Sequence, residues 1–176
     1  MATKQIPMAD TSSATNSNPL YDKWVLWAHL PHDTDWTMES YIRIMTIASC
    51  EEAVELYKSI PEKLTTNCML FLMRDGVTPT WEDSRNRSGG CFSYKIPNKS
   101  VSELWTKLSF SVMGESISRD TSFLRKTTGV TISPKRAFCI IKVWMEDMDF
   151  QNPRLIEEGI GLPSHGCLFK KHKPNY

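Results

Sequence analysis

Two tryptophans occur in turn-rich segments, each directly after a run of β-forming residues. Trp81 follows the segment 75–80 and is followed at once by Glu82, while Trp36 follows the segment 32–35. An indole face can stack on any nucleic-acid base, which contributes about 1 to 3 kcal/mol per base. A carboxylate only accepts hydrogen bonds, and guanine presents N–H donors on its Watson–Crick edge. Trp81 and Glu82 together therefore favour guanine over adenine as a ligand.

Trp36 could form a second platform on the other face of the same base. Two indoles around one base would favour a cationic ring, because aromatic faces are electron-rich, and N7-methylguanine is such a ring. The plainer alternative is that the Trp81 ring folds onto the rim of the core while the Glu82 carboxylate is solvated. The pattern alone leaves both interpretations open.

Basic residues flank a third tryptophan further along the chain. Lys135 and Arg136 precede a predicted strand that ends near Trp144, and Lys142 lies within that strand. Such side chains bind phosphate groups through charge-assisted hydrogen bonds. They also guard strand edges against aggregation or form a solvated face, so the cluster is compatible with phosphate binding without requiring it.

The overall composition argues against several classes of protein. The 176 residues include 21 basic and 20 acidic side chains, and the formal net charge of +1 provides no general field for duplex nucleic acid. No apolar run approaches the length of about 20 residues that a membrane span needs, so we expect a cytoplasmic protein without membrane contact. The five cysteines form no metal-binding motif, and no motif of a nucleophilic, phosphate-binding, zinc-protease or dinucleotide site occurs. We therefore expect no enzyme activity, no metal and no cofactor.

The elements that must position these residues are predicted from hydrophobic spacing. Residues 1–17 are rich in Thr, Ser and Asn and predict a disordered tail, which leaves residues 18–176 as a single domain. Capping boxes at Ser49 and Ser100 predict two amphipathic helices, and Asn152 followed by Pro153 predicts a third, shorter one. Strands do not alternate regularly with helices, which indicates an α+β fold with a mostly antiparallel sheet. Seven β-like runs are predicted, at 23–30, 40–46, 68–74, 91–95, 129–133, 137–145 and 166–171.

Taken together, the sequence resembles the messenger-RNA cap-binding translation initiation factors of the 4E family. The resemblance runs from about Asn18 to Pro163. It implies a strongly curved, mostly antiparallel sheet of about seven to eight strands, backed by three helices on the convex face. The motifs that carry it are Asn18-Pro19-Leu20, the tryptophans at 24, 27, 36, 81, 105 and 144, the loop 75–83, Arg87-Ser88-Gly89-Gly90, Met113-Gly114-Glu115 and Gly161-Leu162-Pro163.

The resemblance implies a role for each residue that would touch the base. Trp36 and Trp81 would sandwich 7-methylguanine, and the Glu82 carboxylate would accept hydrogen bonds from its N1–H and N2–H groups. The backbone amide of Trp81 would donate to O6. Trp144 would lie against the N7 methyl group.

The phosphate-binding residues match the family less closely. Lys135 occupies the position of a family arginine that holds the cap triphosphate, whereas Ile140 replaces a family lysine. Arg136 or Lys142 would substitute for that lysine.

The resemblance also implies a protein partner on the convex face. Relatives bind a Tyr-x-x-x-x-Leu-apolar helix there, from the scaffold factor of the 4G class or from repressors, beside a tryptophan of the first helix. Val54 replaces that tryptophan, so the affinity or identity of the partner would differ. Outside that complex we expect a monomer. The expected partner surface comprises Pro19, Val54, Leu56, Tyr57, Leu104 and Trp105, although Trp105 also fits the apolar stripe of its own helix and so a place in the core.

The sequence thus predicts a non-enzymatic protein that binds the 7-methylguanosine 5′ cap of messenger RNA in translation initiation. Two alternatives remain. One is a cap-binding translational repressor that lacks the usual scaffold interaction, which the replacement at Val54 keeps open. The other is a general single-stranded RNA-binding module, which the carboxylate of Glu82 disfavours because a fixed anion repels phosphates.

Overall fold

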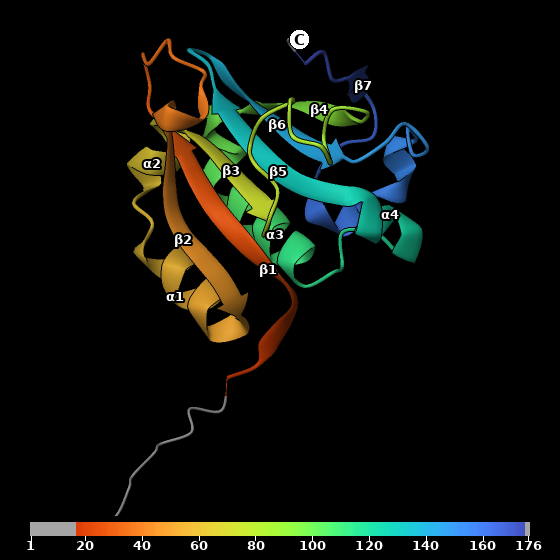
Figure 1. The fold of residues 1–176 in the computed structure, drawn as a ribbon, viewed down its shortest axis with the longest axis horizontal. Helices are drawn as coiled ribbons and strands as arrows, with labels where there is room; N and C mark the ends of the chain where they lie inside the picture. The colour runs from red at the N-terminus through yellow and green to blue at the C-terminus, as the bar shows by residue number, and fades with distance from the viewer. Residues whose placement is uncertain (1–16, 175–176) are drawn as a thin grey trace, which may run out of the picture.

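Seven antiparallel strands form one curved sheet in the order β2-β1-β3-β5-β6-β4-β7 (Figure 1). The structure, a computed structural model, describes residues 17–174. Every pair of neighbouring strands is antiparallel, in agreement with the predicted α+β class. The strands are β1 Pro19–His29, β2 Tyr41–Ser49, β3 Met69–Arg74, β4 Gly90–Pro97, β5 Thr127–Pro134, β6 Phe138–Met145 and β7 Leu168–Lys171.

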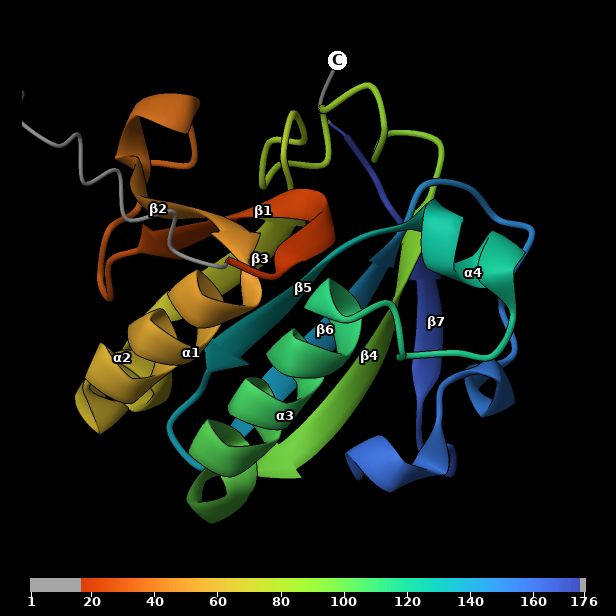
Figure 2. The same cartoon turned by 90° about the horizontal axis from the view of Figure 1, so that it is seen from below.

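Helices cover one face of the sheet and leave the other face to loops (Figure 2). They are α1 Cys50–Ser59, α2 Glu62–Asn67 and α3 Val101–Met113, and α4 Thr121–Lys126 lies beside the start of β5. The main core fills the space between sheet and helices, where Trp24, Trp105 and Leu108 are fully buried. This arrangement agrees with the helix-backed sheet that the resemblance implies, although α2 was not among the helices predicted from the sequence.

The alternation of side chains along β6 gives each face of the sheet its own hydrophobic cluster. Cys139, Ile141 and Val143 point into the main core. Trp144 belongs instead to a smaller cluster on the helix-free face. Successive side chains of a strand point to opposite faces, so Lys142 shares the helix-free face with Trp144. The smaller cluster consists of Phe71, Met73, Val77, Cys91 and Trp144.

The predictions for the strands and for the first helix are confirmed. All seven β-like runs are strands. The capping box at the start of α1 is present, because the Ser49 hydroxyl accepts from the Glu52 amide and the Glu52 carboxylate accepts from the Ser49 amide. This reciprocal pair satisfies two donors that the first helical turn leaves open.

Two predicted helix features are wrong. Ser100 precedes α3, but its side chain makes no capping hydrogen bond, because residues 98–100 already turn as a 3₁₀-helix. Asn152 does accept from the Arg154 amide, at 3.1 Å, yet only the 3₁₀ turns 153–155 and 158–160 follow in place of a third α-helix. Gly161, with φ of 95°, ends the second turn in the left-handed region. The short helices α2 and α4 were not predicted.

Two further expectations concern the ends of the chain and the membrane. The predicted disordered tail, residues 1–17, lies outside the described residues except for Ser17.

Within residues 17–174, no helix combines the length and the apolar character that crossing a membrane requires.

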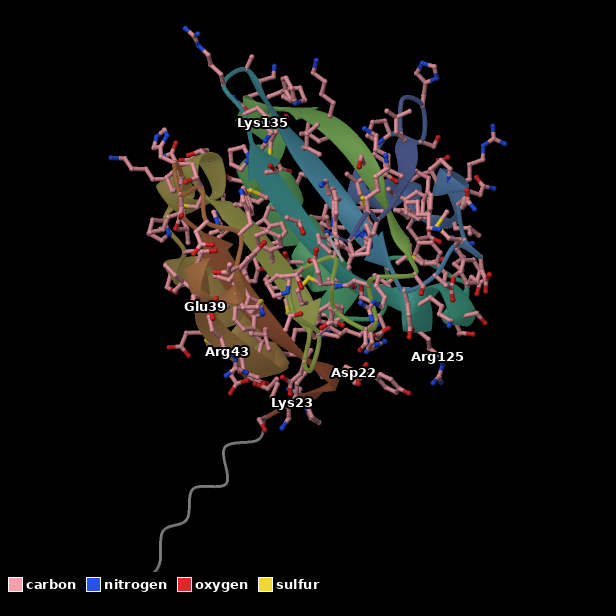
Figure 3. The ribbon with its side chains drawn as sticks, turned by 45° about the horizontal axis from the view of Figure 1, so that its top comes forward. Asp22, Lys23, Glu39, Arg43, Arg125 and Lys135 are labelled. Carbon is pink, nitrogen blue, oxygen red and sulfur yellow. The ribbon has the colours of Figure 1, made fainter. Side chains whose placement is uncertain are left out.

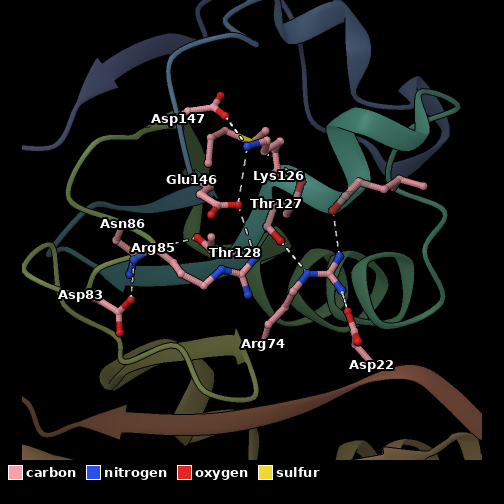
Figure 4. A network of polar contacts seen from close by, with 12 residues as sticks. Asp22, Arg74, Asp83, Arg85, Asn86, Lys126, Thr127, Thr128, Glu146 and Asp147 are labelled. Atoms are coloured by element: carbon pink, nitrogen blue, oxygen red, sulfur yellow. Dashed lines mark hydrogen bonds and ion pairs between the residues drawn. The ribbon is translucent and has the colours of Figure 1, made fainter.

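A buried arginine holds the end of β3, where the loop that carries Trp81 begins. Arg74 donates to the carbonyl oxygens of Thr127 and Leu124, at 2.8 Å each, and to both carboxylate oxygens of Glu115, at 2.7 and 3.1 Å. It also donates to Asp22 (Figure 4). These contacts join β1, β3 and the segments around α4 at one point.

Candidate base-binding slot

A cavity of about 450 Å³ opens on the helix-free face of the sheet. That volume lies within the range of about 300 to 1,000 Å³ that is usual for small-molecule sites. Of the seven residues predicted to touch base or phosphate, six line this cavity, which we call the slot. They are Trp36, Trp81, Glu82, Lys135, Lys142 and Trp144.

The floor of the slot is a fixed series of aromatic rings. Trp144 is 3% exposed, and its ring meets Phe71 edge to face at 6.4 Å between centroids. Phe71 in turn meets Tyr41 at 5.3 Å and 66°. Edge-to-face contacts place the positive ring edge against a negative ring face, which stabilises one orientation of each ring. Trp144 therefore borders the slot as a rigid part of the sheet.

The loop that carries Trp81 is held by its own polar side chains. The Asp83 carboxylate accepts from the Thr78 amide at 2.8 Å and from the Thr78 hydroxyl at 2.7 Å, and it also accepts from the Arg85 amide at 2.8 Å. The buried Asn86 side chain donates to the carbonyl oxygens of Thr78 and Thr80 and accepts from a hydroxyl of β5. Figure 4 shows Asp83 and Asn86 within this network. The loop is thus shaped before any ligand arrives.

One face of Trp81 is covered by a histidine from the C-terminal end of the chain. The His172 ring lies nearly parallel to the indole, at 5.7 Å and 11°, and also contacts Trp144 at 4.8 Å. Its Nδ1 donates to the Asn86 carbonyl oxygen at 2.8 Å. Burial lowers the pKa of His172 below the ordinary histidine value. Nothing in the local sequence pattern links position 172 to position 81, so this contact was not predicted.

Trp36 projects from the segment between β1 and β2 and is 55% exposed. Its indole stacks on the buried His29 ring, at 4.2 Å between centroids and 3° between planes. The Nε2–H of His29 donates to the carbonyl oxygen of Asp35, at 2.7 Å. The Asp33 and Asp35 carboxylates accept backbone amides two residues ahead and shape the turn. From the sequence, His29 was expected only as part of the β-like run 23–30.

The walls of the slot carry charges of both signs. Burial, and to a lesser degree the negative charge of Glu82, raise the pKa of Tyr41 to about 12. The Lys142 ammonium lies 5.8 Å from the centroid of the Trp81 ring. Lys135 lies exposed beyond the end of β5, at the rim (Figure 3). The Glu82 carboxylate, which only accepts hydrogen bonds, and the ammonium groups of Lys135 and Lys142 thus border the same aromatic cavity.

Arg136 is the one predicted ligand residue that does not line the slot. It lines a second cavity of about 560 Å³, whose wall includes His29 and Asn67. The two cavities share Trp36, Met69 and Lys135. Arg136 lies at the bend of the turn between β5 and β6, which the Lys135 amide closes by donating to the Phe138 carbonyl oxygen at 2.8 Å.

Only some of the residues expected to bind a protein partner have exposed side chains. Pro19 is exposed, Val54 is 42% exposed, and Tyr57 is half-buried. Three of the six expected residues, Leu56, Leu104 and Trp105, are buried in the main core, with Trp105 at 0% exposed. The structure corrects the expectation for these three, because their side chains pack between sheet and helices and offer a partner little surface.

Sequence comparisons point to one family. The sequence pattern described as eukaryotic initiation factor 4E matches residues 19–173. Eukaryotic translation initiation factor 4E of Saccharomyces cerevisiae is 29% identical over 154 residues, which cover 84% of this chain and 71% of that protein. The Eremothecium gossypii protein of the same name is 28% identical over 147 residues, covering 80% of this chain and 68% of that protein.

Solved structures show the same fold. Ascaris suum eIF4E-3 with an m7G cap superposes with a TM-score of 0.77 at 17% identity, covering 90% of this chain and 93% of that one. Schistosome eIF4E complexed with m7GpppA and 4E-BP has a TM-score of 0.78 at 19% identity, covering 88% of each chain.

Proposed function

This chain belongs to the eukaryotic initiation factor 4E family, and from that premise we propose that it binds the 7-methylguanosine 5′ cap of messenger RNA in the slot and acts in translation initiation. One observation carries the proposal. Two tryptophans from separate loops, and the carboxylate that follows one of them, border a single cavity. In this proposal the protein binds the cap and does not change it chemically.

Stacking supplies the preference for the methylated base. With the base between Trp36 and Trp81, both of its faces meet electron-rich rings. Methylation at N7 gives guanine a positive charge, and aromatic faces attract a cation most strongly when both are shielded from water. Trp144 lies on the floor beside these walls and is the residue we assign to the N7 methyl group.

Hydrogen bonding supplies the preference for guanine. The Glu82 carboxylate accepts from the N1–H and N2–H donors of the base, and the Trp81 backbone amide donates to O6. A hydrogen bond to a charged group contributes about 1.5 to 3 kcal/mol. Adenine lacks the N1–H donor and the N2 amino group and would leave the carboxylate without its partners.

The triphosphate lies along the rim, with Lys135 and Lys142 as its cationic partners. Both line the slot, whereas Arg136 faces the second cavity. We therefore assign the role of the family lysine that Ile140 replaces to Lys142. Its ammonium lies close to the Trp81 ring, at 5.8 Å, and can reach a phosphate beside a stacked base.

A translational repressor is the second candidate function, and the convex face favours it. Val54 provides a small exposed side chain on α1, where an indole would give a partner helix a larger anchor. Binding of a Tyr-x-x-x-x-Leu-apolar peptide that mimics the 4G-class scaffold, abolished by Val54→Asp, would support the role in initiation. A protein that binds the cap but not this peptide would favour the repressor.

Calorimetric titration with 7-methyl-GTP tests cap binding in the slot. Trp36→Ala and Trp81→Ala should each cost about 1 to 3 kcal/mol of binding free energy, because one stacking face is lost. Tyr21→Ala is the matched control, since Tyr21 is an aromatic residue that is 71% exposed and does not line the slot. Wild-type affinity in either tryptophan variant would overturn the sandwich.

A further inference from the structure

The two slot tryptophans differ in how they are held. The loop of Trp81 is braced by the side chains of Asp83 and Asn86, whose hydrogen bonds tie residues 78–86 together. Trp36 is more than half exposed. Within residues 17–174, His29 is the one ring that contacts its indole. The orientation of Trp36 therefore depends on His29 far more than that of Trp81 depends on any single residue.

His29 is itself fixed by the sheet. It ends β1, is 2% exposed, and meets the Tyr41 ring edge to face at 5.2 Å and 66°. Tyr41 meets Phe71 at 5.3 Å, and Phe71 meets Trp144 at 6.4 Å. A continuous series of ring contacts thus joins Trp36 to the floor of the slot.

His29 holds the Trp36 loop at two adjacent points. Its ring lies parallel to the indole at 4.2 Å, and its Nε2–H donates to the carbonyl oxygen of Asp35 at 2.7 Å. The first contact sets the plane of the indole, and the second sets the position of the backbone from which the indole projects. One imidazole can supply both contacts because its edge donates while its face stacks.

We propose that His29 is a positioning residue for cap binding, which fixes Trp36 as a stacking platform before the ligand arrives. This inference rests on the proposed function of the slot. An exposed tryptophan that is free to change rotamer loses that freedom when a base stacks on it, and this loss weakens binding. The stack on His29 removes this cost in advance. The outer face of the indole remains open to the base.

The contact can be tested without any ligand. A stacked indole shifts the ring protons of a histidine beneath it upfield in the NMR spectrum. The His29 ring protons should show this shift in the free wild-type protein and lose it in Trp36→Ala. Unchanged His29 shifts in Trp36→Ala would overturn the proposal whether or not the protein binds a cap.

The affinity for 7-methyl-GTP then separates the ring from the hydrogen bond. His29→Ala removes both and should weaken binding about three- to tenfold. His29→Phe keeps a stacking ring of similar size and should restore affinity to within about twofold. The control is His165→Ala, which removes an exposed histidine elsewhere and should have no effect. Equal losses in His29→Ala and His29→Phe would overturn the role of the stack.

A double-mutant cycle excludes a general disturbance of the fold. If His29 acts through Trp36, then His29→Ala should cause no further loss of affinity in a Trp36→Ala background. A loss of the same size in both backgrounds would show a general structural effect and overturn the proposal. Failure of the wild-type protein to bind 7-methyl-GTP would instead refute the proposed function, and the NMR test would still decide whether His29 holds Trp36.

Discussion

Lys135 and Arg136 are adjacent in the sequence, yet only Lys135 lines the slot. Replacing each by Ala removes the same charge from almost the same place, which makes one variant the control for the other. If the triphosphate lies along the slot rim, the two variants must differ in their affinity for 7-methyl-GTP. They must differ little in their affinity for 7-methylguanosine, which has no phosphates.

The expected magnitude follows from the exposure of Lys135 and from the general strength of charge attraction in water. Two unit charges about 6 Å apart in water attract by about 0.7 kcal/mol. Direct hydrogen bonding to a phosphate adds to this, and the exposed position of Lys135 keeps the total near the low end of charge-assisted bonds. We expect Lys135→Ala to lose about 1 to 1.4 kcal/mol, or about five- to tenfold, toward 7-methyl-GTP. Arg136→Ala should lose less than about twofold, because salt screens its longer-range attraction.

Calorimetric titration of each variant with both ligands, at about 0.05 and 0.2 M salt, measures these differences. The deficit of Lys135→Ala should shrink as salt rises, since ions already screen part of the attraction in the wild-type protein. Equal deficits in the two variants would refute the assignment of the phosphates to the slot rim. So would an equal deficit of Lys135→Ala toward 7-methylguanosine.

Three further predictions follow from contacts in and around the slot. Glu82→Gln should weaken 7-methyl-GTP binding by about 1 to 3 kcal/mol, because an amide N–H₂ would face guanine donors, whereas Glu55→Gln on α1 should have no effect in the same titration. Arg74→Leu should lower the free energy of urea unfolding by about 3 kcal/mol, because two carbonyl oxygens and the Glu115 carboxylate lose their buried donor, and an unchanged unfolding midpoint would contradict this. Burial lowers the pKa of His172 in the folded state. The unfolded chain therefore binds more protons once the pH falls below about 6.5, and stability declines there. The melting temperature should thus drop less between about pH 7.5 and 5.5 in His172→Phe than in the wild type, and equal drops would exclude His172 as the cause.

Local patterns were sufficient to predict the sheet and the first helix. Most strands are runs of apolar residues that include β-branched or aromatic side chains, so their signal lies within the run itself. The capping box at Ser49 is equally local, because both partners lie within four residues. At Ser100 the same motif, a serine followed by a glutamate three residues later, did not form a capping box, since a 3₁₀ turn over 98–100 leads directly into α3.

Slot residues that lie together on one loop could be predicted from the sequence. Slot residues that come from distant segments could not. Trp81 and Glu82 are consecutive, so their joint presence in one cavity could be expected. His172 lies 91 positions beyond Trp81 and reaches it only because β7 pairs with β4 at the edge of the sheet. His29 is close to Trp36 in sequence, but its stack depends on the fold of the turn between them, which the spacing of residues does not encode.

We claim above all that the slot selects the methylated cap. Intrinsic tryptophan fluorescence, titrated with 7-methyl-GTP and separately with GTP at one salt concentration, tests this most directly, because the proposed platforms are themselves the reporters. Strong quenching by 7-methyl-GTP, with GTP at least about tenfold weaker, or about 1.4 kcal/mol, is the predicted result. No quenching, or equal quenching by both nucleotides, would contradict the claim.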